Sequence, residues 1–162
     1  MDVPLSSGRP VDAQITIRRG VLSDLPAATA VFQSASLSNA GDRDNLLAHQ
    51  EYLALQPDGL ADGRTYVAER GGALVGFATW NESGGSYELE DLFVDPAWMR
   101  HGIATALVGR IAGILRAHGV RHLEVTANPH AMEFYRAAGF VDHGTARTVF
   151  GVAARMVLHI EP

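Results

Sequence analysis

Cysteine is absent from all 162 residues. Disulfide bonds, thiolate metal ligands and a cysteine nucleophile are therefore excluded. The sequence also lacks a run of about 18 apolar residues, the length that a membrane-spanning helix requires. Residues 1–13 have neither the basic start nor the apolar core of a secretion signal. From these absences we expect a cytoplasmic protein with no membrane partner.

The chain also has no excess of positive charge. It contains 13 Lys and Arg residues and 18 Asp and Glu residues, which gives a net charge of −5. This balance argues against nucleic acid as a partner. None of the seven histidines stands at metal-ligand spacing from a carboxylate, so we expect no metal site. No G-x-S-x-G elbow and no P-loop occur, which argues against an α/β-hydrolase nucleophile and a Walker-type nucleotide site.

The hydrophobic period changes several times along the chain and predicts a mixed α/β domain over residues 14–162. A flexible leader rich in Pro, Ser and Gly precedes it at residues 1–13. The predicted strands are 14–20, 64–70, 72–80, 86–94, 120–128, 139–144 and 149–160. The predicted helices are 24–37, 42–53, 103–118 and 129–139.

The order of these elements predicts how the strands pair. Strands 86–94 and 120–128 flank a helix, so a right-handed crossover should make them parallel. Short Gly-rich links join the three strands between residues 64 and 94, which favours an antiparallel meander. We therefore expect a mostly antiparallel sheet of six to seven strands with one parallel pair, flanked by about four helices. The last strands leave an exposed edge that is compatible with a homodimer.

The turn "MRHGIAT" at residues 99–105 leads into the third long helix. The first N–H groups of a helix are unpaired and carry partial positive charge, which suits a phosphate. Gly102 lets an anion approach the backbone closely, and Arg100 adds charge. On its own, a Gly-x-Ala turn is better explained as a tight turn than as an anion site. A Rossmann fingerprint would need a third glycine after Ala104, although Glu124 stands at about the expected distance.

Two motifs at a fixed separation resemble the GCN5-related N-acetyltransferases (GNAT family). The run "LEDLFVDPAWMRHGIATAL" resembles the strand and the Q/R-x-x-G-x-G/A loop that wraps the pyrophosphate of acetyl-CoA. "ANPHAMEFYRAAGF" resembles the second motif, in which an Asn precedes a Tyr-bearing helix ending in Gly-Phe. The resemblance covers roughly Ile15 to Ile160 and implies a GNAT-like fold with acetyl-CoA as co-substrate. Met99 departs from the pattern, which has Arg or Gln at the first loop position.

The resemblance implies a set of residues for acetyl-CoA. They are Leu92, Phe93, Val94, Met99, Arg100, His101, Gly102, Ile103, Ala104, Thr105, Asn128 and Tyr135. Main-chain atoms of the first three would pair with the pantetheine arm, whose amides resemble a short strand. Asn128 either contacts the coenzyme or serves only as a helix N-cap.

The implied reaction is attack of an amine on a thioester, so a proton must leave the amine and another must reach the thiolate. The segment "ELEDLF" resembles the acidic pair of small-amine members of the family. This likeness assigns Glu90 as base, directly or through a water, and Asp91 as a ligand of the substrate's cation. Glu88 and Trp80 complete the predicted substrate-binding residues. A solvated strand face explains each carboxylate equally well.

Strict alternation along residues 86–94 predicts two faces for this strand. One face would carry Glu88, Glu90, Leu92 and Val94, and the other Leu89, Asp91 and Phe93. A bulge would upset this assignment.

Tyr135 matches the family tyrosine whose hydroxyl points at the thioester sulfur. A phenol with a pKa of about 10 can protonate a thiolate with a pKa of about 8.5 at little cost. Without the motif, Tyr135 would be read as a core aromatic on a stripe with Ala131, Phe134 and Ala138.

We therefore predict an acetyl-CoA-dependent N-acetyltransferase that acts directly on a primary amine of a small molecule. The first two helices, their 38–44 loop and the segment 143–151 should select the acceptor, with Asp42 and Asp44 as contributors. Two alternatives remain. One is a non-catalytic acyl-CoA-binding or sensing module, and the other is an acetyltransferase of protein N-termini or lysines.

Overall fold

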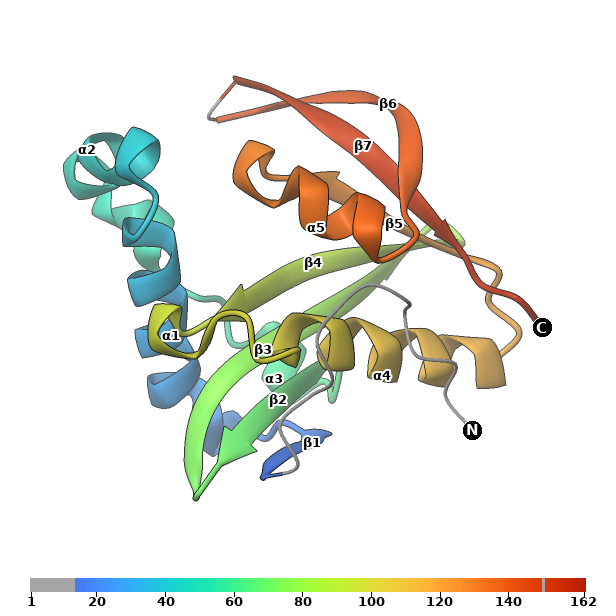
Figure 1. Ribbon diagram of the computed structural model, residues 1–162, viewed down its shortest axis with the longest axis horizontal. Helices are drawn as coiled ribbons and strands as arrows, with labels where there is room; N and C mark the ends of the chain where they lie inside the picture. The colour runs from blue at the N-terminus through green and yellow to red at the C-terminus, as the bar shows by residue number, and fades with distance from the viewer. Residues whose placement is uncertain (1–13, 150) are drawn as a thin grey trace.

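A computed structural model describes residues 14–149 and 151–162. Seven strands form one sheet in the order β1-β2-β3-β4-β5-β7-β6 (Figure 1). The strands are β1 (Ile15–Arg19), β2 (Thr65–Arg70), β3 (Ala73–Ser83), β4 (Ser86–Val94), β5 (His122–Ala127), β6 (Val141–Thr148) and β7 (Gly151–His159). Neighbouring strands pair antiparallel except for β4 and β5, which are parallel. The predicted sheet is confirmed, whereas the predicted leader lies outside the described residues.

The described residues contain five α-helices where about four were expected. They are α1 (Leu25–Leu37), α2 (Ala40–Ala48), α3 (Asp58–Ala61), α4 (Ile103–Ala117) and α5 (Met132–Ala137). The predicted helix 42–53 is two elements, because His49 leaves the helical conformation (φ −129°, ψ 70°) and a 3₁₀ turn at Gln50–Leu53 follows. The added helix α3 is a single turn within a segment that the sequence predicted to be a break.

The helices cover the two faces of the sheet (Figure 1). On one face α4 and α5 pack in the larger core cluster. On the other face α1 contributes Ala28 and Val31 to a smaller cluster with Val67 and Phe77. The apolar stripe of α4 follows the helical period that the sequence showed. Its buried residues are Ile103, Leu107, Val108, Ile111, Ala112 and Leu115.

Gly76 on β3 determines how closely the start of α4 approaches the sheet. A Cβ atom at this position would lie 2.9 Å from Cγ2 of Ile103 and 3.1 Å from the carbonyl oxygen of Phe93. The missing side chain therefore leaves room for the first residue of α4 to pack directly on β3. The position of the helix N-terminus follows from this contact.

A bulge in β4 corrects the predicted face assignment of this strand. Thr79 on β3 pairs with Asp91 while the next residue, Trp80, pairs with Leu89, so Glu90 has no partner across the ladder. Leu89, Leu92 and Val94 consequently all contact the core on the α4 side, whereas Phe93 packs with the α1 cluster. The prediction that Leu89 lies on the opposite face from Leu92 and Val94 was wrong, because the extra residue at Glu90 reverses the pleat.

The parallel pairing of β4 and β5 is short. It consists of Glu88 opposite Glu124 and Leu89 opposite Val125. Beyond these two pairs the strands separate, and the sheet opens next to the bulge at Glu90. The start of α4 and the helix α5 border this opening.

Candidate active site

The loop before α4 is wound so that the helix begins with free N–H groups. Gly102 is the N-cap residue with φ 77°, and Arg100 is the one non-glycine residue with positive φ (66°) within residues 14–149 and 151–162. The carboxylate of Asp95 accepts a hydrogen bond from the N–H of Ala97 at 2.9 Å and fixes the preceding turn. The first-turn N–H groups of α4 have no acceptor within the helix, so they favour an anion.

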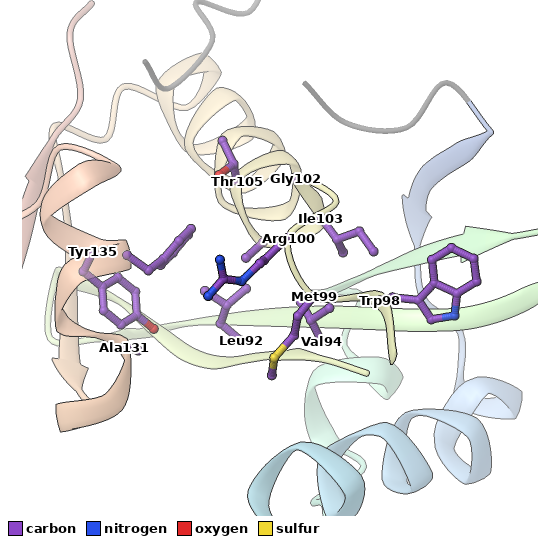
Figure 2. A pocket seen from close by; sticks show the side chains of 12 residues that line it. Leu92, Val94, Trp98, Met99, Arg100, Gly102, Ile103, Thr105, Ala131 and Tyr135 are labelled. Carbon is purple, nitrogen blue, oxygen red and sulfur yellow. The ribbon is translucent and has the colours of Figure 1, made fainter. Parts of the chain in front are cut away.

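A cavity of about 430 Å³ adjoins this helix start (Figure 2). Most of the residues predicted for acetyl-CoA line it, namely Leu92, Val94, Met99, Arg100, Gly102, Ile103, Ala104, Thr105 and Tyr135. Arg100 extends from the loop toward Tyr135, and the hydroxyl group of Tyr135 points into the cavity (Figure 2).

Trp98, Ala131 and Phe134 also line this cavity, although the sequence analysis did not assign them to the site. The sequence pattern could have identified two of them, because Ala131 and Phe134 lie on the same helical stripe as Tyr135. A stripe of this kind predicts core residues as readily as residues that line a cavity. The role of Trp98 depends on the fold of the loop, which sequence periodicity does not report.

A second cavity, of about 470 Å³, begins at the same wall and extends toward α1 and α2. Five residues line both cavities, namely Leu92, Val94, Met99, Ala131 and Tyr135. Ser38, Asn39 and Asp42 line it from the α1–α2 side, and Thr148 and Val152 line it from the β6–β7 hairpin. The tip of that hairpin extends toward α2 (Figure 1). The segments predicted to select the acceptor thus border this second cavity.

Tyr135 is positioned where the two cavities meet. Its side chain is only 6% exposed, and its ring makes edge contacts with Phe134 and Phe140. Burial raises the pKa of Tyr135 above the ordinary value of 10. The phenol therefore stays protonated at neutral pH, so it acts as a hydrogen-bond or proton donor and not as a base.

Glu90 and Asp91 diverge at the bulge. The Glu90 side chain is half exposed and lines the second cavity. Asp91 lines neither cavity. Burial, together with the negative charge of Glu90, raises the pKa of Asp91 to about 6, although a hydrogen bond from Thr79 and the charge of Arg64 act in the opposite direction.

Three residues predicted for acetyl-CoA lie outside the first cavity. Phe93 packs against Phe32 and Phe77 and lines the second cavity only. Asn128 also lines the second cavity, and its side chain accepts a hydrogen bond from the N–H of His130 at 2.9 Å, as a helix cap does. His101 packs against the ring of Trp98 and lines neither cavity.

All three residues predicted to bind substrate line neither cavity, since Trp80 and Glu88 share this position with Asp91. Trp80 is partly buried and its ring lies 6.0 Å from that of Tyr87. The Glu88 carboxylate accepts a 2.6 Å hydrogen bond from Nη1 of Arg155 and a longer one from Thr126. A direct contact of either side chain with the acceptor therefore finds no support in this geometry.

The sequence model of the acetyltransferase (GNAT) family matches residues 30–140. The chain therefore belongs to the GNAT family, which confirms the resemblance noted from its motifs. It is 37% identical over 94 residues to the N-alpha-acetyltransferase RimI of Mycobacterium tuberculosis. This match covers 54% of the chain and 59% of the relative, so it spans little more than half of either protein.

Solved structures of the same fold include two further acetyltransferases. The ribosomal-protein-S18-alanine N-acetyltransferase of Escherichia coli has 24% identity and a TM-score of 0.68, with 91% of this chain and 95% of that chain covered. The paiA N-acetyltransferase of Thermoplasma acidophilum, solved in complex with coenzyme A, has 16% identity and a TM-score of 0.69, with 90% and 98% covered. At these identities the likeness concerns the fold.

Among residues 14–149 and 151–162, no group of three or more His, Asp or Glu side chains is arranged to hold a metal ion. Within the same residues, no helix has the length and apolar character needed to cross a bilayer.

Proposed function

We propose that this GNAT-family protein transfers the acetyl group of acetyl-CoA to the α-amino group of a peptide chain. The observation that carries the proposal is the wall shared by the two cavities where β4 and β5 separate. One cavity ends at a helix N-terminus, and the other opens toward α1, α2 and the β6–β7 hairpin. Two reactants that enter from different sides can meet at this wall.

The first cavity fits acetyl-CoA in its chemistry. Free N–H groups at Ile103, Ala104 and Thr105 and the guanidinium of Arg100 suit a pyrophosphate. The apolar side chains of Leu92 and Val94 suit the pantetheine arm, and the separated edge of β4 offers main-chain partners for its amides. Met99 supplies no charge, so backbone groups and Arg100 would carry the binding of the pyrophosphate.

Two reasons favour an α-amine as the acceptor. One is the low pKa of an α-amine, and the other is the similarity of this chain to an N-alpha-acetyltransferase. A peptide α-amine has a reference pKa of about 8 and a lysine side chain one of about 10.4, so the α-amine reaches its reactive neutral form far more readily. Glu90 is the carboxylate at the bulge beside the second cavity. The likeness to an N-alpha-acetyltransferase supports the same class of acceptor. The small-molecule acceptor predicted from the sequence remains a prediction that the same assay tests.

The reaction assigns one role to each group at the shared wall. Glu90, directly or through a water, would remove the proton from the amine as its nitrogen attacks the thioester carbon. An N–H of the opened β4 edge would stabilise the oxygen as it gains charge. Tyr135 would donate a proton or a hydrogen bond to the departing thiolate. The pKa that burial raises above 10 keeps this donor protonated, and it favours a hydrogen bond to the thiolate over full proton transfer because the phenol is a weaker acid than the sequence predicted.

A thiol-release assay with acetyl-CoA tests the transfer. Peptides with a free N-terminus should be turned over, whereas the same peptides with a blocked N-terminus and a free lysine should not. The panel also includes polyamines, amino acids and aminoglycosides. The enzyme itself contains no lysine, so none of its own side-chain amines competes as acceptor. Binding of coenzyme A without thiol release for any amine would instead identify a non-catalytic binding module.

Gly102→Glu tests where the coenzyme binds. A carboxylate at this position should repel the pyrophosphate, so calorimetric binding of coenzyme A should be lost. Gly102→Ala separates charge from strain, because any side chain at φ 77° is strained. Gly109→Glu is the matched control, since it adds the same acid to the same helix where a Cβ meets no atom within 4 Å. Unchanged binding by Gly102→Glu would contradict the assignment of the helix start as the coenzyme site.

A further inference from the structure

Arg64 lies next to the bulge of β4, although it belongs to the connection between α3 and β2. Its Nη1 donates a 2.8 Å hydrogen bond to the carbonyl oxygen of Trp80, and its Nη2 donates a 3.1 Å bond to Asp62. The backbone carbonyl of Arg64 accepts a 3.2 Å bond from the N–H of Trp80. The side chain is 18% exposed. These contacts hold the guanidinium in one place.

The same guanidinium faces the acidic pair at the bulge. Nη1 of Arg64 lies 3.6 Å from Oε2 of Glu90, and its charge lowers the pKa of Asp91 against the effect of burial. Trp80, whose carbonyl it binds, is the β3 residue next to Thr79, where the register shifts. Arg64 therefore connects the start of β2, the shifted position of β3 and the bulged residue of β4.

The ion pair between Arg64 and Glu90 should contribute little to the stability of the fold. The Glu90 side chain is 51% exposed, and exposed ion pairs contribute little to folding because water and salt screen them. Its geometric effect is larger. A guanidinium fixed by the carbonyl of Trp80 restricts where the Glu90 carboxylate can lie, and Glu90 lines the second cavity.

We propose that Arg64 is a positioning residue that fixes the Glu90 carboxylate on the wall of the acceptor cavity. This inference rests on the proposed function, in which Glu90 receives the proton of the amine. Arg64 touches neither cavity, so it acts through Glu90.

Charged groups approach Glu90 from the α3–β2 connection, from β4 and from the residues that line the second cavity. Arg64 and Asp62 approach from the α3–β2 connection, and Asp91 is its neighbour on β4. Asp42 and His130 line the same cavity, and they pair with each other at 3.7 Å. Among the described residues, Arg64 is the only one of these groups that is a cation within 4 Å of the Glu90 carboxylate. Its loss should therefore raise the pKa of Asp91 further and leave the Glu90 carboxylate without the cation that holds it.

Three variants separate charge, geometry and structure. Arg64→Gln removes the charge but keeps an amide that can donate to the carbonyl of Trp80. Arg64→Lys keeps the charge but loses the planar fork that reaches Trp80 and Glu90 together. Asp62→Asn is the control, because it weakens the outer contact of Arg64 and leaves the other two intact.

Carbon-13 NMR of the carboxyl groups of Glu90 and Asp91 is the primary measurement, since it needs no turnover. In Arg64→Gln the titration midpoint of Asp91 should move to higher pH, by about half a pH unit or more, and the carboxyl signal of Glu90 should change, while Asp62→Asn and the parent should agree. The value of kcat should fall with little change in coenzyme A binding, because the Glu90 carboxylate is no longer held on the cavity wall. Arg64→Lys should restore the midpoint of Asp91 but not the full kcat.

An unchanged Asp91 midpoint and an unchanged Glu90 carboxyl signal in Arg64→Gln, in a variant that melts like the parent, would overturn the proposal. A loss of activity without either spectroscopic change would also overturn it, because a purely structural role has that signature. Both spectroscopic changes in a protein that acetylates no amine would support the assignment of Arg64 while contradicting the proposed function.

Discussion

Replacing Asp91 with asparagine should change how the stability of this protein depends on pH. Asp91 is the carboxyl group whose pKa burial raises from the ordinary value of 3.8 to about 6. A group with a raised pKa in the folded state favours folding while it is protonated. That contribution is fully present below the unfolded pKa and is lost as the pH rises through the folded pKa. Wild type should therefore lose stability between about pH 4 and pH 6.

The magnitude follows from the two pKa values. A difference of about 2 pH units, at about 1.4 kcal/mol for each unit, corresponds to about 3 kcal/mol in total. About 2 kcal/mol of this falls between pH 4 and pH 7. The asparagine side chain in Asp91→Asn does not titrate, yet its amide oxygen can still accept the hydrogen bond from Thr79. This variant should consequently gain about 2 kcal/mol of stability relative to wild type over that interval.

Urea unfolding at several pH values, followed by the fluorescence of Trp80 and Trp98, measures this difference. Asp24→Asn is the informative control. A hydrogen bond from Arg18 lowers the pKa of Asp24, so its contribution is present at neutral pH and lost as the pH falls. The control variant should lose stability at pH 7 and none at low pH. Parallel pH curves for wild type and Asp91→Asn would refute the reasoning about the buried carboxyl group.

Other substitutions test the packing and the chemistry of the site. Gly76→Ala forces a Cβ against Ile103 and the carbonyl of Phe93, so it should cost about 1–3 kcal/mol in thermal unfolding and weaken coenzyme A binding. Leu107→Ala removes a fully buried side chain of α4 and should cost about 2–5 kcal/mol in urea unfolding. Tyr135→Phe keeps the ring packing but removes the donor, so kcat for a good peptide should fall about 10²-fold with little change in KM. An unchanged kcat would exclude Tyr135 as the donor to the thiolate.

The antiparallel meander of β2, β3 and β4 and the parallel pair of β4 and β5 could be predicted because their determinants are local, whereas the place of β7 between β5 and β6 was not predicted. Alternating segments, glycine-rich links and a helix between strands 86–94 and 120–128 each constrain the topology within a few residues of sequence. The boundary at His49 could not be predicted in this way. Helical periodicity continues across it, and its departure from helical φ and ψ has no signature in the residue type.

The bulge at Glu90 shows what a local pattern omits. Residues 86–94 alternate well enough to suggest two faces, but the register also depends on what β3 presents at Thr79 and Trp80. Asp91 faces Thr79, and Thr79 shares a 2.7 Å hydrogen bond with Thr65 on the next strand. These three polar residues come from three different strands. Because these three residues pack together, Asp91 is the buried carboxyl group and Glu90 is the one that lines the second cavity.

The two sides of the site therefore differ in how far the sequence could describe them. On the side of the first cavity, a positive φ at Gly102 and unpaired N–H groups belong to one continuous segment, so the motif at residues 99–105 could predict residues that line this cavity, His101 excepted. On the acceptor side, the cavity needs α1, α2, β4 and the β6–β7 hairpin at once. Sequence patterns identified those segments but not their contacts. Because Glu90 depends on Arg64 and on the register of β3, changes far from the cavity should alter the acceptor reaction without affecting coenzyme binding.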